Sequence, residues 1–167
     1  MTAAPLFPFR QYDPLVGPEL TLTVNRCLEG NQALEGAPAY LFDIRLNDGL
    51  AIGQIDLRIG HGHSLVTYAG HIGYGIEPAH RGHYYAAQAC QLLVDVALDH
   101  DMEALWITCN PDNLGSIKTC QRLGARLIEK VKVPLWSELW RRGDREKLRF
   151  LWQLRPTANL TVLSGHD

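Results

Sequence analysis

The sequence predicts a mixed α/β (α+β) domain with one dominant sheet, and two observations lead to this fold class. Apolar and polar residues alternate with a period of two through most of residues 19–77, which is the pattern of half-buried strands. The period then changes to helical spacing twice, at about residues 80–100 and again after residue 113. The predicted order is four strands, a helix, a strand, a helix and two strands, which packs helices on a sheet.

The first half of the chain is predicted to consist of strands joined by turns. Residues 1–18 carry four prolines, which exclude a regular helix and indicate an extended N-terminal arm lying on the body. The Asp48-Gly49 pair indicates a hairpin between the second and third strands. The stretch 60–70 is rich in His and Gly and is expected to be a loop, and Pro78 ends the fourth strand. Alternation places the four strands at residues 19–28, 40–46, 50–59 and 71–77.

The second half is predicted to alternate helices with strands. Apolar residues at helical spacing predict an amphipathic helix over about residues 80–100. For the second helix, Asn113 supplies an N-terminal cap and Gly124 a C-terminal cap. Charged residues 141–147 join the last two strands. The three strands expected in this half lie at residues 104–109, 127–133 and 148–154.

Composition and charge exclude several classes of function. The 167 residues carry a formal net charge of −2, without the clustered Lys and Arg that binding to a phosphate backbone requires, so no nucleic-acid partner is expected. The apolar runs are shorter than the roughly 20 residues of a membrane helix, and no signal-peptide pattern begins the chain. We therefore expect a cytoplasmic protein with a single domain at residues 19–156 and a C-terminal tail at residues 157–167.

Cysteine and histidine spacing favours neither disulfides nor a metal site. The four cysteines form no CxxC pair and match no small secreted scaffold, so free thiols are expected. His61 and His63, with His71 nearby, lack further ligands at a recognisable spacing. We predict no bound metal and interpret their loop as the flexible border of a cleft.

The most informative segment is the junction between the fourth strand and the first helix. The first turn of a helix has backbone N–H groups without intrahelical partners, and the macrodipole adds partial positive charge there. Such a terminus binds phosphate. Gly82 lets the backbone approach a ligand closely, and Arg81 adds a charge-assisted hydrogen-bond donor.

This junction resembles the diphosphate-binding loop of the Gcn5-related N-acetyltransferases (GNAT). The family's loop reads Pro-x-x-Arg-Gly-x-Gly-x-Gly/Ala, and Pro78, Arg81, Gly82 and Ala86 match it. Tyr84 stands where the family has its second glycine. We expect a helical φ angle at Tyr84, which would shift the cofactor rather than abolish its binding.

A second block, downstream of the loop, also resembles the family. The family pattern is Asn-x-x-Ala-x-x-x-Tyr-x-x-x-Gly-Phe, and Asn113 and Gly124 match it. Three family residues are replaced, by Ser116 for Ala, Cys120 for Tyr and Ala125 for Phe. The resemblance covers residues 53–125 well and the rest of the chain through strand order.

The resemblance implies a twisted, mostly antiparallel sheet of about seven strands, flanked by helices. It also implies that the fourth and fifth strands splay around acetyl-CoA as co-substrate. The pantetheine arm is expected along the end of the fourth strand, and the diphosphate on the amides at the start of the helix. The residues expected to bind the cofactor are Tyr74, Gly75, Ile76, Glu77, Arg81, Gly82, His83, Tyr84, Tyr85, Ala86, Asn113 and Ser116.

The resemblance also implies transfer of the acetyl group to a primary amine, of a small molecule or a protein, by direct attack in a ternary complex. The candidate catalytic residues are His71, Glu77 and Cys120. His71 is nearest the place where some family members keep a base, Glu77 is a second candidate base, and Cys120 takes the place of a tyrosine acid. The alternatives are a structural role for His71 and an apolar core role for Cys120.

Two further alternatives concern the acceptor and the activity. Residues 29–38 are too few for the paired helices that usually wall the acceptor site, so the cleft is either open or completed by another subunit. Trp136 and Trp140 indicate either substrate contact or a homodimer interface. Tyr84 and Cys120, as departures from the family pattern, also fit a non-catalytic acyl-CoA-binding regulatory domain.

Overall fold

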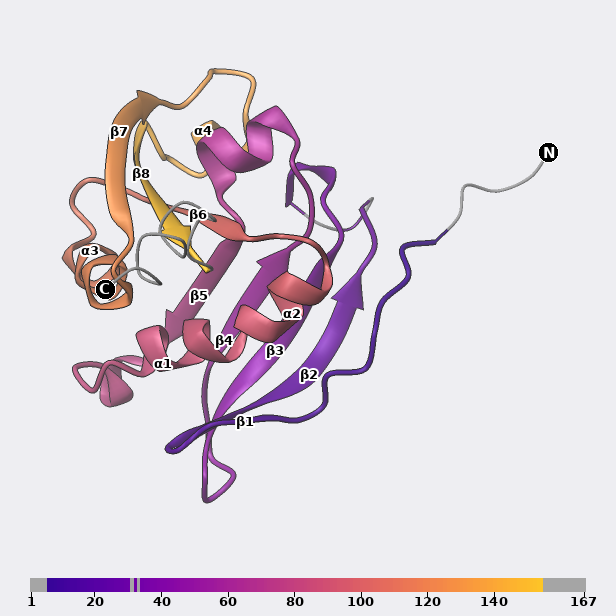
Figure 1. The fold of residues 1–167 in the computed structure, drawn as a ribbon. Helices are drawn as coiled ribbons and strands as arrows, with labels where there is room; N and C mark the ends of the chain where they lie inside the picture. The colour runs from indigo at the N-terminus through magenta and orange to yellow at the C-terminus, as the bar shows by residue number, and fades with distance from the viewer. Residues whose placement is uncertain (1–5, 31, 33, 155–167) are drawn as a thin grey trace, which may run out of the picture.

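The structure, a computed structural model, describes residues 6–30, 32 and 34–154 (Figure 1). The predicted C-terminal tail at residues 157–167 lies outside the described residues. Within the described part the chain forms eight strands, four α-helices and three short helical segments of other types. The mixed α+β fold with mostly antiparallel sheets is therefore confirmed, with eight strands instead of about seven.

Five strands form the larger sheet. Neighbouring strands are antiparallel and follow chain order. The strands are β1 (Leu15–Val16), β2 (Leu20–Leu28), β3 (Ala39–Leu46), β4 (Ala51–Arg58) and β5 (Ile72–Ile76). The short strand β1, within the segment expected to be an N-terminal arm, pairs with β2 at the edge of this sheet.

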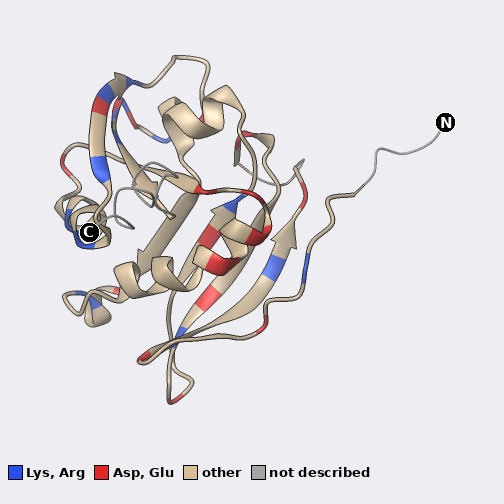
Figure 2. Ribbon diagram, viewed as in Figure 1, with Lys and Arg blue, Asp and Glu red and all other residues tan. Residues whose placement is uncertain are grey.

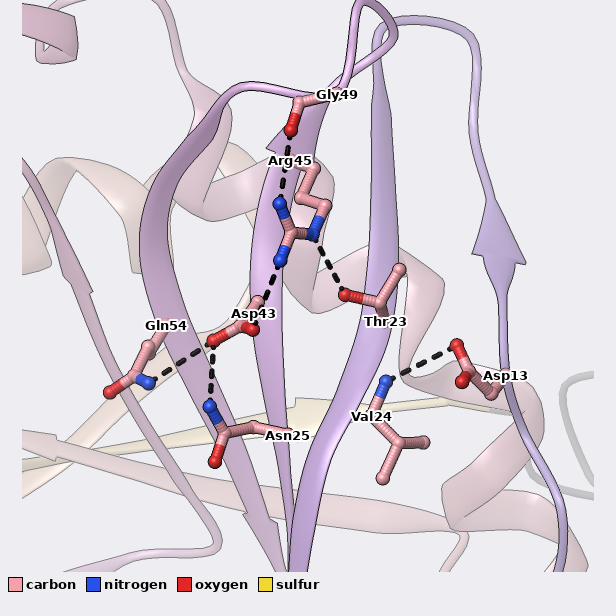
Figure 3. A network of polar contacts seen from close by, with 8 residues as sticks. All are labelled: Asp13, Thr23, Val24, Asn25, Asp43, Arg45, Gly49 and Gln54. Atoms are coloured by element: carbon pink, nitrogen blue, oxygen red, sulfur yellow. Dashed lines mark hydrogen bonds and ion pairs between the residues drawn. The ribbon is translucent and has the colours of Figure 1, made fainter.

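Alternation along β3 gives this sheet one apolar and one polar face. Phe42 and Ile44 are fully buried, and helices cross that face in Figure 1. On the opposite face Arg45 donates hydrogen bonds to Thr23 and to the Gly49 carbonyl (Figure 3). Arg45 also pairs with Asp43, and the Asp43 carboxylate accepts further hydrogen bonds from Asn25 and Gln54. Polar pairs across the strands thus fix the register from the exposed side.

Three strands form the smaller sheet, in the order β6-β8-β7. They are β6 (Ala104–Cys109), β7 (Arg126–Lys132) and β8 (Glu146–Gln153), all antiparallel. No strand pairing joins β5 to β6 in the described residues, so the sheet is divided there.

The helix predicted over residues 80–100 is two helices and begins later. They are α1 (Tyr85–Leu92) and α2 (Val94–Asp99), which bury Ala89, Leu93 and Val96 against the sheet. The helix tightens at Leu93, whose N–H bonds to Cys90 three residues earlier. Helical geometry does not reach back to residue 80, because a 3₁₀ turn (Pro78–His80) and a left-handed residue precede α1.

The helix α3 (Leu114–Leu123) is capped as predicted. The Asn113 side chain accepts from the Ser116 N–H at 3.1 Å, and Gly124 ends the helix at φ 77°. The cap matters for the site because it fixes the position of Ser116.

Short helical segments were not predicted, and two of them lie near the site. A π-helix (Leu65–Ala69) lies within the stretch expected to be a loop, and α4 (Glu138–Arg141) overlaps the expected charged connection. Both bury apolar side chains in the same small cluster, to which Leu65, Ala69 and Leu139 belong together with Ala37 and Val133. Segments of four or five residues are too short to show a helical period in the sequence.

The surface carries both signs of charge, since Lys and Arg as well as Asp and Glu are spread over strands and helices (Figure 2). No helix among the described residues is long and apolar enough to cross a membrane.

Candidate active site

The division between β5 and β6 begins at His71, which joins the two strands at one end only. The His71 N–H donates to the Trp106 carbonyl oxygen at 2.7 Å, and the Trp106 N–H donates to His71 Nδ1 at 2.9 Å. His71 and Trp106 thus exchange two hydrogen bonds, as paired residues of neighbouring strands do, but one of them is accepted by the imidazole ring and not by a backbone carbonyl. Beyond this point no backbone hydrogen bond links the two strands, and they separate.

The hydrogen bonds of His71 engage both of its ring nitrogens. Because Nδ1 accepts, Nε2 carries the proton and donates to the Gly60 carbonyl oxygen at 2.9 Å. The residue is 2% exposed, and burial lowers the pKa of its imidazole despite the bond to Gly60. The ring is thus neutral and has no free nitrogen, and this geometry favours the structural role of His71 over the catalytic one.

The register of β5 determines which of its backbone groups face the division. The Arg58 N–H donates to the His71 carbonyl and the Glu77 N–H donates to the Ile52 carbonyl, so residues 73, 75 and 77, together with the His71 carbonyl, direct their backbone groups toward β4. Tyr74 and Ile76 therefore direct theirs toward the gap. The Ile76 carbonyl is taken by Arg81, whose Nε donates to it at 2.8 Å, which leaves the N–H groups of Tyr74 and Ile76 and the Tyr74 carbonyl available.

The loop between β5 and α1 turns through two left-handed residues. Gly82 has φ +90° with open space around its Cα, and Tyr84 has φ 62° and ψ 24°. The expectation of a helical φ at Tyr84 is therefore wrong: the tyrosine has the left-handed backbone that glycine adopts most readily. The Arg122 guanidinium lies 4.1 Å from the centre of the Tyr84 ring and helps to hold it.

This turn leaves the start of α1 open. The first bond of the helix runs from Gln88 N–H to the Tyr84 carbonyl at 3.1 Å. The amides of Tyr85, Ala86 and Ala87 precede it and have no intrahelical partner. Aligned amides at a helix start form a binding site for an anion.

A cavity of about 720 Å³ connects the open amides with the edge of β5. Its volume is in the range of roughly 300–1,000 Å³ typical of cofactor sites. Ten of the twelve residues predicted to bind a cofactor line it, and Glu77 and His83 do not. The lining residues are Tyr74, Gly75, Ile76, His80, Arg81, Gly82, Tyr84, Tyr85, Ala86, Asn113, Gly115, Ser116, Lys118 and Thr119.

Sequence reasoning missed four residues of this cavity, namely His80, Gly115, Lys118 and Thr119. Lys118 and Thr119 lie on α3 within the second family block, one turn after Gly115 and Ser116, and therefore share a helix face with them. The helical spacing from Gly115 and Ser116 was the signal that would have found them.

A second, smaller cavity of about 190 Å³ lies on the other side of the division. Tyr74, Asn113 and Ser116 line both cavities. The second cavity is otherwise lined largely by the end of β6 and by residues around α4 and β8, of which the polar and charged ones are Arg58, Thr108, Asn110, Arg142, Asp144 and Lys147. Sequence reasoning missed this set, because residues 141–147 show no periodicity and were interpreted as a connection.

Tyr74 and Ser116 meet where the two cavities join. The Tyr74 hydroxyl donates to Ser116 Oγ at 3.0 Å. Burial raises the pKa of Tyr74 to about 12, so the phenol stays protonated. The pair places two hydroxyl groups at the junction.

Neither Cys120 nor Glu77 reaches this junction. Cys120 is fully buried in the main core, and burial raises its pKa to about 12, which makes the thiol a weak proton donor. Glu77 is exposed and lines a separate hollow with Asp43 and Gln54. The geometry thus offers no support for a catalytic role of either residue.

The second cavity holds one carboxylate, that of Asp144. Burial alone would raise its pKa, but hydrogen bonds from Asn110 (3.0 Å) and Lys147 (3.1 Å) and the nearby charge of Arg142 lower it overall. Asp144 is therefore ionised and already paired. Among residues 6–30, 32 and 34–154, no three His, Cys, Asp or Glu side chains form a group that could hold a metal ion.

A divided antiparallel sheet, with an open helix start beside the division and a cofactor-sized cavity between them, is the arrangement that the resemblance to the CoA-dependent GNAT acyltransferases implied. Residues 18–126 match the family model of the acetyltransferase (GNAT) domain. The chain therefore belongs to the GNAT acetyltransferase family, as its motifs indicated. Acetyl-CoA is the co-substrate that this membership implies. No curated protein matches the chain.

Solved structures show the same fold at low sequence identity. The microcin C7 self-immunity acetyltransferase MccE, solved with acetyl-CoA and AMP, is 18% identical over 69% of this chain, with a TM-score of 0.54. The ribosomal L7/L12 alpha-N-protein acetyltransferase RimL, solved with CoA, is 15% identical over 84% of this chain and 98% of its own, with a TM-score of 0.61.

A third similar structure is the ribosomal-protein-S5-alanine acetyltransferase of Vibrio fischeri. It is 18% identical over 71% of this chain and 64% of its own, with a TM-score of 0.54. The chain spans 61% of the length of MccE, so it corresponds to less than two thirds of that protein. At these identities the likeness concerns the fold.

Proposed function

We propose that the protein transfers the acetyl group of acetyl-CoA to a primary amine by direct attack in a ternary complex. The observation that carries the proposal is the meeting of two cavities at Tyr74 and Ser116, through the division between β5 and β6. One cavity has the size and polar groups for CoA. The other gives a second substrate access to the same point from the opposite side.

CoA is assigned to the larger cavity on the chemistry of its walls. The amides from Gly82 to Ala86, with Arg81, would hold the diphosphate. The pantetheine arm would bond to the backbone groups of Tyr74 and Ile76 that face the gap, in the manner of an added strand. This arrangement ends the arm beside Ser116, where the thioester is required.

The amine then attacks the thioester carbonyl from the smaller cavity. A backbone N–H of β5 that faces the gap, such as that of Tyr74, would stabilise the developing oxyanion, a type of contact worth about 10²–10³ in kcat. Holding both substrates at one junction supplies much of the remaining acceleration. Both ring nitrogens of His71 already form hydrogen bonds, and Asp144 is ionised and paired. We therefore propose that water in the open cavity accepts the proton that the attacking amine loses.

We propose that the Ser116 hydroxyl, supported by Tyr74, stabilises the leaving CoA thiolate. Moving a proton from a phenol with a pKa of about 12 to a thiolate of ordinary pKa, about 8.5, is uphill by about 5 kcal/mol. The pair therefore stabilises the thiolate by donating a hydrogen bond and does not give up its proton. A bond to a charged group of this kind contributes about 1.5–3 kcal/mol.

The test is CoA release from acetyl-CoA in the presence of a panel of primary amines. Ser116→Ala should lower kcat about 10–100-fold with CoA binding retained. Cys120→Ala serves as the matched comparison, since a thiol in the core should leave the kcat of the folded enzyme unchanged. Loss of activity in Cys120→Ala with Ser116→Ala active would reverse the assignment.

The second candidate function is a non-catalytic acyl-CoA-binding regulatory domain. The specific observation that favours it is the buried Cys120, which leaves the family's tyrosine position without a proton donor. Tight acetyl-CoA binding with no CoA release across the whole amine panel would support this function and exclude transferase activity.

A further inference from the structure

We infer that the amine acceptor is a small molecule that carries an anionic group, a carboxylate or a phosphate, within a few atoms of its amine, and that Arg142 with Lys147 binds that group. The inference rests on the proposed function, because it assigns the smaller cavity to the acceptor. Three observations carry it: the volume of the cavity, its charges and its unused hydrogen-bond donors.

The volume limits the part of the acceptor that the cavity can enclose. At about 190 Å³, the cavity is smaller than the roughly 300–1,000 Å³ of pockets that hold drug-sized ligands. The same space reaches from Tyr74 and Ser116, where the amine must attack, to Arg142 and Lys147. An amine and a recognition group that occupy it together are therefore separated by only a few atoms, as they are in a small molecule.

The charges of the cavity wall do not cancel. The charge of Arg58 is paired, since its Nε lies 3.0 Å from the Asp56 carboxylate, and its Nη1 donates to the carbonyl oxygens of Ala69 and Gly70 at 3.0 Å each. Lys147 pairs with Asp144. After these two pairs, the cation that is left over in the wall is Arg142.

The donors of the wall outnumber its acceptors. The two carboxylate oxygens of Asp144 accept from Asn110 and from Lys147. The Lys147 ammonium has three donors and, among the described residues, bonds only to Asp144. The Arg142 guanidinium has five donors and forms no hydrogen bond or ion pair within the described part of the chain.

Such a wall matches a ligand that is rich in acceptors. A carboxylate or phosphate accepts bidentate bonds from a guanidinium and a further bond from an ammonium. A neutral alkylamine would leave these donors without partners, and the excess positive charge of the wall would not contribute to its binding. The enzyme is therefore expected to prefer an anionic acceptor over a neutral one that differs from it only in the anionic group.

The experiment compares isosteric acceptors in the CoA-release assay. β-Alanine and β-alaninamide have the same amine and nearly the same shape but differ in the carboxylate, and phosphoethanolamine is compared with ethanolamine. We expect kcat/KM for the anionic member of a pair to exceed that of its neutral partner by about tenfold or more, with a preference that shrinks as salt is added.

Arg142→Gln tests the residue assignment, with Arg141→Gln as its control. Arg141, the last residue of α4, is exposed like Arg142 but does not line the cavity. Arg142→Gln should lower kcat/KM for β-alanine about tenfold and remove most of the preference, whereas Arg141→Gln should retain it.

The outcomes separate this inference from the proposed function. Turnover with equal kcat/KM for charged and neutral acceptors, or a preference that survives Arg142→Gln, would overturn the inference and leave the transferase proposal standing. Faster turnover of a peptide N-terminus than of any small anionic amine would also overturn it. CoA binding without release for every amine would overturn the proposed function, and the inference with it.

Discussion

Replacing Tyr84 tests the turn that opens the start of α1. The residue has φ 62° and ψ 24°, a left-handed conformation that costs a non-glycine residue roughly 1–2 kcal/mol. Tyr84→Gly removes this cost, but it adds about 0.5–1 kcal/mol through the greater freedom of glycine in the unfolded chain. Tyr84→Ala keeps the cost, and both variants lose the contact with Arg122 equally.

The two variants should therefore differ in stability in a direction that depends on the backbone conformation of residue 84. Tyr84→Gly should be more stable than Tyr84→Ala by about 0.5–1 kcal/mol, whereas at an ordinary helical position alanine is the more stable residue by about 1 kcal/mol. Urea unfolding measures the difference directly, and in a domain of this size it corresponds to a melting temperature about 1–4 °C higher. If Tyr84→Ala proves as stable as Tyr84→Gly or more so, the backbone at this position is not left-handed, and the open turn is refuted.

Two further predictions concern the loop and the division of the sheet. Gly82→Ala, at φ +90°, should weaken CoA binding about tenfold in calorimetry. Gly143→Ala, at φ +99° and outside the lining of the larger cavity, should cost similar stability and leave CoA binding intact. Equal losses of affinity in the two variants would contradict the assigned CoA site. The pKa of His71 is lowered from 6.5 by burial, so the unfolded chain binds more protons there. The stability that His71 contributes should be complete above pH 6.5 and fall as the pH falls below it. The difference in unfolding free energy between wild type and His71→Asn measures this contribution, and a difference that stays constant from pH 8 to pH 5 would contradict it.

Local pattern predicted those elements whose signal lies in adjacent residues. The hairpin at Gly49 was predicted because turn chemistry acts over a few residues, and α3 because Asn113 and Gly124 cap it. The cofactor motif was found for the same reason: Arg81 and Gly82 are neighbours in sequence as well as in space.

The features that the sequence did not reveal depend on contacts between distant residues. The division of the sheet rests on bonds between His71 and Trp106, which are 35 residues apart. The smaller cavity combines Arg58 with Arg142 and Lys147, which only the packing of α4 brings together. Tyr84 was predicted with the wrong φ angle, because a tyrosine prefers the helical region unless the surrounding turn prevents it.

A crystal structure of the protein with acetyl-CoA would show directly whether the start of α1 binds the diphosphate. We predict diphosphate oxygens about 3 Å from the amides between Gly82 and Ala86, and the thioester sulfur beside Ser116 at the junction of the two cavities. CoA bound elsewhere, or a first turn of α1 whose amides have no phosphate partner, would contradict this binding mode.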